Sequence, residues 1–534
     1  MSGPRNANAN VNVNAQTTPD RTTPSPTTDG RPSAGPVTVG RSPAGPPHVV
    51  VVGGGISGLA AAHRLVTAGA RVTLLEGGSR LGGKLLAGEI AGAPVDLGAE
   101  SLLARRPEAV ALAERVGLAD RIQAPATTTA SVWSRGELVP MPKGHVMGVP
   151  ADGRAVERLL SAEAVARIER DRELPPTEIG EDIAIGAYVA ERMGHEVVDR
   201  LVEPLLGGVY AGDAYRISMK AAVPALFRAA RTHATLGEAV RAVQRAGAAT
   251  PADAAGAGTG IAGGGLGGAA FAGLRGGIGT LPLAVADAVR AAGGEIRTGT
   301  PVTGLRRTGP DGWQVVTPER TYAADAVVLA TPAGPAAALL ADHAPAASAE
   351  LDAVEYASMA LITLAFRRAD LPDGTGLPGS GFLVPPVDGH TIKASTFASR
   401  KWGWIADAAP DLFVLRTSVG RYGEEEQVHR DDADLVDVSL KDLGAATGLA
   451  ARPVATSVTR WIGGLPQYPV GHLARVGRIR TAVSALPGLA LAGAVYEGVG
   501  IPACVASAHR AADEILDEII ATSQKADPGA GHCP

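Results

Sequence analysis

The chain has 534 residues, which is enough for two or three domains around a large buried core. Its formal net charge of −5 excludes the basic footprint of a nucleic-acid-binding protein. The two cysteines, Cys504 and Cys533, have neither metal-ligand spacing nor a disulfide framework, so we expect no metal site and a reducing, cytoplasmic compartment. No apolar run reaches the length of a transmembrane helix, and the N-terminus lacks a secretion-signal pattern.

A dinucleotide-binding motif follows a polar tail at residues 1–47. Val49 to Val52 are an unbroken apolar run, typical of a parallel strand covered on both faces. Gly53, Gly55 and Gly58 have G-x-G-x-x-G spacing, and a helical pattern, a second apolar strand and Glu76 come next. The glycines permit the turn, the approach of a pyrophosphate and close helix–strand packing, while the helix N-terminus offers N–H groups to phosphates. Glu76 is placed to bind ribose hydroxyls. The alternative is a plain βαβ packing unit.

A second glycine turn, R-x-G-G-K, contains Arg80, Gly83 and Lys84. A cofactor with a long second half would need such a loop near the phosphate site, whereas a nicotinamide cofactor usually would not. The alternative is an ordinary glycine turn. Next come a strand-to-loop segment at 95–101 and a helix predicted from Pro107 to Val116.

Farther along, short strands are expected at 125–150, and apolar stripes at 151–231 predict helices with an internal core. Buried strands recur at 326–330 and 489–494, so the parallel sheet must be assembled from separated parts of the chain. Alternating patterns at 359–367, 381–384 and 411–419 predict a second, antiparallel sheet for substrate binding. We expect a loop from Arg460 to Pro469 and a helix from Ala503 to Ile519.

The sequence therefore predicts an α/β protein with a discontinuous Rossmann-type domain, a mixed-sheet substrate domain and a helical insertion. The predicted division is a disordered tail (1–47), the dinucleotide domain (48–125, 271–340 and 456–520), the substrate domain (126–150 and 341–455), the helical insertion (151–231), a flexible Ala/Gly loop (246–270) and a flexible C-terminus (521–534).

Three blocks resemble the flavin amine oxidase/protoporphyrinogen oxidase superfamily: VVVGGGISGLAAAHRL with its following LLE, then RLGGK, then LAGAVYEGVGIPACVASAHRAADEI. The segments LVEPLLGGVYAGD, FAGLRGGIGTLP and GVGIPACV narrow the match to the porphyrinogen oxidases. The ARRPEAV stretch and the Ala-, Gly- and Arg-rich composition favour the coproporphyrinogen III oxidases over the protoporphyrinogen oxidases. The resemblance covers nearly all of residues 48–520. The tail and the Ala/Gly loop depart from the family's compact pattern.

This resemblance implies a non-covalent FAD and the oxygen-dependent, six-electron oxidation of a porphyrinogen to a porphyrin in haem synthesis, with peroxide as the by-product. The flavin would take hydride from a meso carbon, so a dedicated protein base is not required and no catalytic residue is assigned. The cofactor-binding residues that it implies are Gly53, Gly54, Gly55, Ser57, Gly58, Glu76, Gly77, Arg80, Gly83, Lys84, Gly98, Ala99, Glu100, Ser101, Val302, Gly498, Val499 and Ile501. For Val302, whose backbone would contact adenine, the alternative is a packed strand valine.

Substrate propionates call for arginine, the side chain best matched to a carboxylate. Arg105 and Arg106 are the first choice, with solvated helix-start arginines as the alternative; Tyr210 either lines the cavity or packs. Glu203 and Asp213 are expected to be caps or surface charges. His145, His195 and His472 are expected to be structural, and Cys504 a small buried residue.

The rival functions are an amine oxidase or carotenoid desaturase of the same fold and a flavin-binding protein without turnover. An amine oxidase would need an aromatic cage at the flavin, and Tyr496 is the only aromatic residue in the C-terminal block. The helical insertion has mixed charge and no strong basic face, so we expect a largely soluble protein. Peripheral membrane contact and transient contact with other haem-synthesis enzymes are left open.

Overall fold

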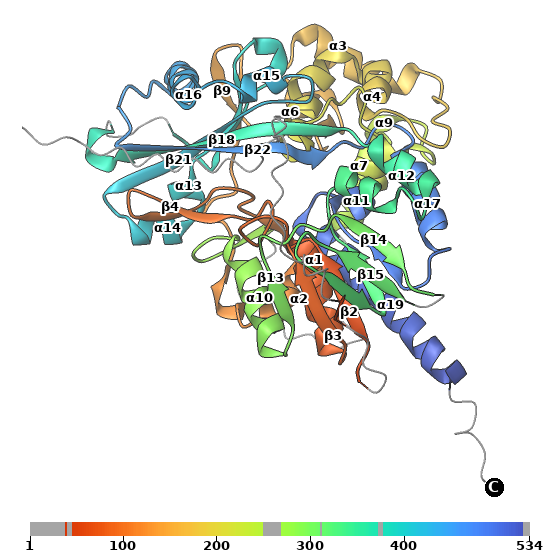
Figure 1. Ribbon diagram of the computed structural model, residues 1–534. Coiled ribbons are helices and arrows are strands. Elements are labelled where there is room, and N and C mark those ends of the chain that lie inside the picture. Colours follow the sequence, from red (N-terminus) through yellow and green to blue (C-terminus); the bar gives the residue numbers. More distant parts are fainter. Residues whose placement is uncertain (1–37, 40–44, 249–268, 310–311, 372–376, 527–534) are drawn as a thin grey trace, which may run out of the picture.

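The computed structural model describes residues 38–39, 45–248, 269–309, 312–371 and 377–526 (Figure 1). Most of the predicted tail, of the Ala/Gly loop and of the flexible C-terminus lies outside these residues. Within the described part of the tail, Thr38–Val39 forms a short strand, β1, that pairs in parallel with β16 (Thr321–Ala324). No helix in the described ranges combines the length and the apolarity needed to cross a membrane.

The first predicted strand lies at the centre of a five-stranded parallel sheet. Its order is β13-β3-β2-β17-β23, and the strands are β2 (His48–Val52), β3 (Arg71–Leu75), β13 (Glu295–Arg297), β17 (Ala326–Leu329) and β23 (Leu489–Leu491). Val52 is paired with Leu75 on one side and with Leu329 on the other. The predicted assembly of this sheet from separated segments is confirmed.

The alternate side chains of β2 face two different cores. Val49 and Val51 pack against α1 (Ile56–Thr67), α2 (Pro107–Arg115), α10 (Thr280–Ala291) and α19 (Ile501–Ala526). Val50 and Val52 pack against a second layer. That layer contains β14 (Gly304–Arg307), β15 (Trp313–Val316), β16 (Thr321–Ala324), α11 (Ala333–Leu340), α12 (Pro345–Asp352) and α17 (His472–Val483). Helix α19 continues beyond its predicted end at Ile519 and into the segment predicted to be flexible.

The predicted second sheet is present and has seven strands in the order β22-β18-β21-β20-β19-β8-β9. They are β8 (Ser131–Ser134), β9 (Glu137–Pro140), β18 (Tyr356–Arg367), β19 (Gly381–Leu383), β20 (Ile392–Thr396), β21 (Leu412–Val419) and β22 (Ala455–Pro466). One face is covered by α15 (Glu425–Val428) and α16 (Asp432–Thr447), and the other by β4 (Ala87–Ile90), β5 (Ala93–Asp96), α13 (Ala398–Lys401) and α14 (Gly403–Ala408).

The predicted loop from Arg460 to Pro469 is wrong, because most of it belongs to β22. This strand pairs antiparallel with β18 along its length, with a bulge between Ala357 and Met359. As an edge strand it leaves most side chains partly exposed, and Gly463 and Gly464 interrupt any alternation. The segment thus belongs to the second sheet rather than to the dinucleotide domain.

The helical insertion forms a core of its own beside one end of the long sheet (Figure 1). Arg192, only 1% exposed, donates from Nε to Asp171 Oδ1 at 2.6 Å and from NH2 to the Asp171 carbonyl at 2.7 Å. A π-helical turn at Val198–Val202 precedes α6. The other helices are α3 (Ala162–Glu169), α4 (Ile185–Met193), α5 (His195–Val197), α6 (Glu203–Tyr210), α7 (Met219–Ala222), α8 (Pro224–Ala230) and α9 (Leu236–Ala248).

Candidate cofactor and active site

The glycine turn after β2 has one open position between two crowded ones. Gly53 has φ +108°, and a Cβ there would lie 2.6 Å from the Ala330 carbonyl oxygen. A Cβ at Gly58 would lie 1.8 Å from the Gly53 carbonyl oxygen. A Cβ at Gly55 would meet no atom within 4 Å. Gly55 therefore borders open space at the N-terminus of α1, where a dinucleotide pyrophosphate would fit.

Glu76 closes the turn at the end of β3. Its carboxylate accepts N–H bonds from Gly54 at 2.6 Å and from Gly78 at 2.7 Å. Thr300 donates its N–H to the Glu76 carbonyl at 2.8 Å, and a Cβ on Gly77 would lie 3.5 Å from Pro301. Val302 is the next residue after Pro301, so the structure brings Glu76, Gly77 and Val302 into one region.

The second glycine turn packs directly on the first. Gly82 donates its N–H to the Gly54 carbonyl at 2.8 Å, and a Cβ on Gly83 would lie 3.3 Å from Gly55. Arg80 donates to the Gly83 carbonyl at 2.8 Å, and its guanidinium lies 5.4 Å from the ring centre of Trp461. The R-x-G-G-K loop is therefore part of the same site.

The C-terminal block reaches this site at the start of α19. Lys84 is exposed, yet surrounding protein desolvates it and lowers its pKa, while the nearby Cys504 acts in the opposite direction. Burial raises the pKa of the Cys504 thiol to about 11, against the effects of Ser57 and Lys84. Its sulfur lies 3.7 Å from the Gly498 carbonyl oxygen. Cys504 is thus a buried neutral thiol, as predicted.

The residues that follow Gly498 pack against two different cores. Ile501 is buried in the core beneath α1, and Val499 packs against the core of the helical insertion. Gly498 itself has φ +131°, a conformation that favours glycine. Gly498, Val499 and Ile501 therefore lie where the dinucleotide domain meets the insertion.

The Gly98–Ser101 segment is held against Lys84 and the second sheet. Ala99 donates its N–H to the Lys84 carbonyl at 3.1 Å. A Cβ on Gly98 would lie 2.1 Å from the same oxygen and 3.1 Å from Trp461. Trp461 also donates from Nε1 to the Leu97 carbonyl at 3.1 Å. No side chain larger than hydrogen fits at Gly98, and Ser101 follows as a partly buried residue.

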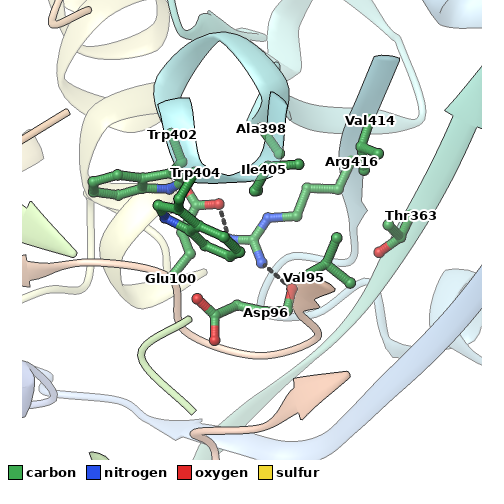
Figure 2. A pocket seen from close by; sticks show the side chains of 10 residues that line it. All are labelled: Val95, Asp96, Glu100, Thr363, Ala398, Trp402, Trp404, Ile405, Val414 and Arg416. Carbon is green, nitrogen blue, oxygen red and sulfur yellow. Dashed lines mark hydrogen bonds and ion pairs between the residues drawn. The ribbon is translucent and has the colours of Figure 1, made fainter. Parts of the chain in front are cut away.

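Glu100 lies in a buried ion cluster beside a small pocket (Figure 2). Its carboxylate contacts Lys401 Nζ at 2.5 Å and Arg416 NH2 at 3.0 Å. Arg416 also donates to the carbonyls of Asp96 at 3.0 Å and Gly98 at 2.8 Å. Burial alone would raise the pKa of Glu100, but Arg416 and Lys401 outweigh it and the net pKa is lowered. The Glu100 carboxylate is therefore bound by these two cations, and a contact of the Gly98–Ser101 segment with the cofactor stays a prediction.

Asp96, which is not among the predicted site residues, holds the start of α10. Its carboxylate accepts N–H bonds from Ile278 and Gly279, both at 2.9 Å, and burial raises its pKa to about 6. A Cβ on Gly277 would lie 2.7 Å from Asp96 Oδ1, which explains a glycine in FAGLRGGIGT. Lys401, Arg416 and Trp461 were also missed, because their sequence surroundings carry no local signal of the site.

The predicted substrate residues are not equally available. Arg105 is exposed, whereas Arg106 pairs with Glu108 at 2.6 Å. Tyr210 is 8% exposed and packs edge-on against Tyr468, with 5.6 Å between the ring centres. Burial raises the pKa of Tyr210 to about 12. Arg105 is thus the predicted carboxylate partner whose side chain is free to reach a substrate.

The remaining candidate side chains bind other groups of the protein. Glu203 accepts the Ala214 N–H at 2.6 Å and Asp213 accepts the Tyr215 N–H at 2.8 Å, so both cap the turn after α6, as predicted. His145 Nδ1 accepts the Gly148 N–H at 3.1 Å, His195 Nδ1 contacts the Tyr215 hydroxyl at 3.0 Å, and His472 is buried. No cluster of His, Cys, Asp or Glu suited to a metal occurs among the described residues.

Glu203 provides a test of pH-dependent stability. The pKa of Glu203 is raised from 4.5 to about 7, mainly by burial and further by the negative charge of Asp213. Because the folded state holds this proton more tightly, the stability contribution is full below pH 4.5 and is lost as pH rises through about 7. We expect Glu203→Gln to exceed the wild type in unfolding free energy by roughly 2–3 kcal/mol at pH 8 and to match it near pH 4.5.

The measurement is urea unfolding across this pH range. Glu238→Gln, which neutralises an exposed carboxylate on α9 of the same insertion, is the matched control and should follow the wild type. Parallel pH profiles for the wild type and Glu203→Gln would contradict the assignment.

The features of this fold and site are those of a dinucleotide-binding protein, in which segments from both ends of the chain surround one glycine turn. The model of the flavin containing amine oxidoreductases matches residues 56–516. The coproporphyrinogen III oxidase of Mycobacterium tuberculosis is 37% identical over 88% of this chain and 97% of its own length. The protoporphyrinogen oxidase of Macaca fascicularis is 29% identical over 88% of this chain and 98% of its own length.

Among solved structures, a candidate protoporphyrinogen oxidase from Exiguobacterium sp. 255-15 is similar, with a TM-score of 0.76 and 33% identity over 90% of this chain and all of that one. The chain belongs to the flavin containing amine oxidoreductase family, and its cofactor is FAD. The residues present fit this cofactor, since Gly55 borders open space and the two glycine turns pack together beside Glu76.

Proposed function

We propose that this protein oxidises coproporphyrinogen III to coproporphyrin III with FAD and molecular oxygen. Six electrons and six hydrogens leave the substrate, and three oxygen molecules take them up as three hydrogen peroxide molecules. The similarity to a coproporphyrinogen III oxidase along 88% of the chain supports the substrate. The observation that carries the proposal is that separated segments of the chain meet around Gly55. The R-x-G-G-K turn packs on Gly55, the Glu76 carboxylate binds the Gly54 N–H, and Cys504 of α19 lies beside Ser57.

The chain's own residues bind and orient. The free N–H groups at the start of α1 receive the pyrophosphate beside Gly55, and Glu76 receives ribose hydroxyls. The Glu100 cluster fixes the Gly98–Ser101 loop, because Arg416 binds both Glu100 and the Gly98 carbonyl. When bound, FAD supplies the acceptor for hydride from a meso carbon. We assign no protein base: the electron-rich macrocycle favours loss of hydride, and the positive charge that this loss leaves on the substrate makes its pyrrole N–H acidic enough to lose the proton without one.

Recognition of the substrate rests on its propionates. Arg105 is exposed beside the Gly98–Ser101 loop and presents a planar guanidinium that matches a carboxylate. Arg106, held by Glu108, is the second choice, and Tyr210 contributes through packing. We further infer a cytoplasmic location, as the cysteine content suggests. Contacts with a membrane surface or with other haem-synthesis enzymes stay predictions.

Protoporphyrinogen IX is the alternative substrate, because relatives named for that reaction also match most of the chain. An amine oxidase is disfavoured: Tyr496 is 3% exposed and packed in the core of the second layer, so it does not form an open aromatic cage. A flavin-binding protein without turnover is the remaining rival.

The test is turnover under air on coproporphyrinogen III and, separately, on protoporphyrinogen IX, followed by porphyrin fluorescence and peroxide release. We expect faster initial oxidation of coproporphyrinogen III, with three peroxide molecules for each porphyrin. The FAD-free protein controls for spontaneous oxidation. A preference for protoporphyrinogen IX would support the alternative, and no oxidation of either substrate by the FAD-loaded protein would refute the proposal.

A further inference from the structure

The short segment 467–472 connects β22 to α17, of which His472 is the first residue, and it binds the helical insertion. Gln467 Nε2 donates to the Tyr210 carbonyl at 2.9 Å, and the Tyr468 carbonyl accepts the Ser218 N–H at 2.8 Å. The Gly471 N–H donates to Asp182 Oδ2 at 2.9 Å. Three separate parts of the insertion are thus bonded to six consecutive residues.

The same segment also binds the start of the short helix α18 (Ala494–Glu497). The Tyr468 hydroxyl donates to the Ala494 carbonyl, and His472 Nε2 lies 2.8 Å from the Val495 carbonyl oxygen. Since a carbonyl only accepts, Nε2 carries the proton. Burial lowers the pKa of His472 to about 4, so the ring stays neutral in this tautomer at physiological pH. The two rings stack with 4.3 Å between their centres.

The bonded carbonyls determine where the next residues of the chain lie. Ala494 and Val495 open the single turn that leads into Gly498, Val499 and Ile501, three of the predicted cofactor-binding residues. The Gly498 N–H points back to the Ala494 carbonyl at 3.3 Å. A shift of that carbonyl therefore moves the loop directly. The far side of the turn is fixed by Glu497, which accepts from Arg480 at 2.9 Å and Arg510 at 2.6 Å.

We propose that Tyr468 and His472 are positioning residues that set the Gly498–Ile501 loop relative to the helical insertion. Their two donors hold consecutive carbonyls of α18, while Gln467 and Gly471 anchor the same segment to the insertion that carries Tyr210. The Gly498–Ile501 loop and the helical insertion are thereby connected through one segment. This inference rests on the proposed function only for its turnover readout.

The test compares Tyr468→Phe, His472→Leu and His472→Gln in the FAD-loaded protein. Tyr468→Phe keeps the ring stack and removes one donor; His472→Leu removes the other, and His472→Gln restores an N–H donor. We expect the first two to shift the flavin absorption bands and the reduction potential. We also expect them to lower kcat about ten- to a hundredfold with KM nearly unchanged, because the substrate would still bind but its reacting atoms would be misaligned with the flavin. His472→Gln should recover most of these losses.

Tyr215→Phe is the matched control, because it removes an exposed hydroxyl bonded to Asp199 on the outside of the insertion. A wild-type spectrum, potential and kcat in Tyr468→Phe would overturn the proposal, as would equal losses in His472→Gln and His472→Leu. If His472→Leu does not fold, Tyr468→Phe alone decides. The spectrum and the potential need no substrate, so they test the positioning role even if coproporphyrinogen III is not oxidised.

Discussion

Gly55→Ala should yield a protein that folds normally and binds FAD at least about a hundredfold more weakly, a loss of about 2.7 kcal/mol. Gly55 has φ −72°, which alanine adopts without strain, and its Cβ would meet no protein atom within 4 Å. The added methyl group would instead occupy the space that the pyrophosphate needs. FAD titration by fluorescence and thermal unfolding of the FAD-free protein measure the two effects separately.

Gly58→Ala is the contrasting variant, three residues along the same turn. Its Cβ would lie 1.8 Å from the Gly53 carbonyl oxygen, so β2 and α1 must move apart. We expect the FAD-free protein to lose about 1–3 kcal/mol of unfolding free energy, in addition to weaker FAD binding. If Gly55→Ala bound FAD as the wild type does, the open space at Gly55 would not be the phosphate site.

Glu100→Gln should lower the unfolding free energy by about 3–5 kcal/mol, because it leaves Lys401 and Arg416 largely buried without their shared counter-charge. The Lys401 and Arg416 side chains are 18% and 12% exposed, so water compensates little. The pKa of Glu100 is lowered in the folded state, so its stabilising effect is present above the unfolded value of 4.5 and is lost as pH falls through the folded value.

Urea unfolding at neutral and at acidic pH measures this effect. Glu89→Gln, on the exposed side of neighbouring β4, is the matched control and should change stability by less than about 0.5 kcal/mol. We expect the gap between the wild type and Glu100→Gln to narrow below pH 4.5. If Glu100→Gln lowered the unfolding free energy at neutral pH no more than Glu89→Gln does, the ion pairs of Glu100 with Lys401 and Arg416 would not stabilise the fold.

Elements encoded by neighbouring residues were predictable from the sequence, and contacts between distant residues were not. The strand, turn and helix around Gly55 follow from periodicity and glycine spacing within about thirty residues, and the structure confirms them. The edge strand β22 was mistaken for a loop, because partial exposure and two glycines erase the alternation that marks a half-buried strand. The sequence also carried no sign that Arg106, a predicted propionate partner, pairs with Glu108, or that the Glu100 side chain is bound by Lys401.

The dinucleotide turn, the need for a discontinuous parallel sheet and the family resemblance all follow from the amino-acid sequence. These depend on residue types at short, fixed spacings, where sterics and backbone geometry act directly. The pairing of Glu100 with Lys401, 301 residues away, and the hydrogen bond from Tyr468 to the Ala494 carbonyl are visible only in the folded chain. Such pairs form only once the two sheets and the insertion have docked. Which residues pair therefore depends on how the chain packs in space. Sequence spacing does not reveal this packing.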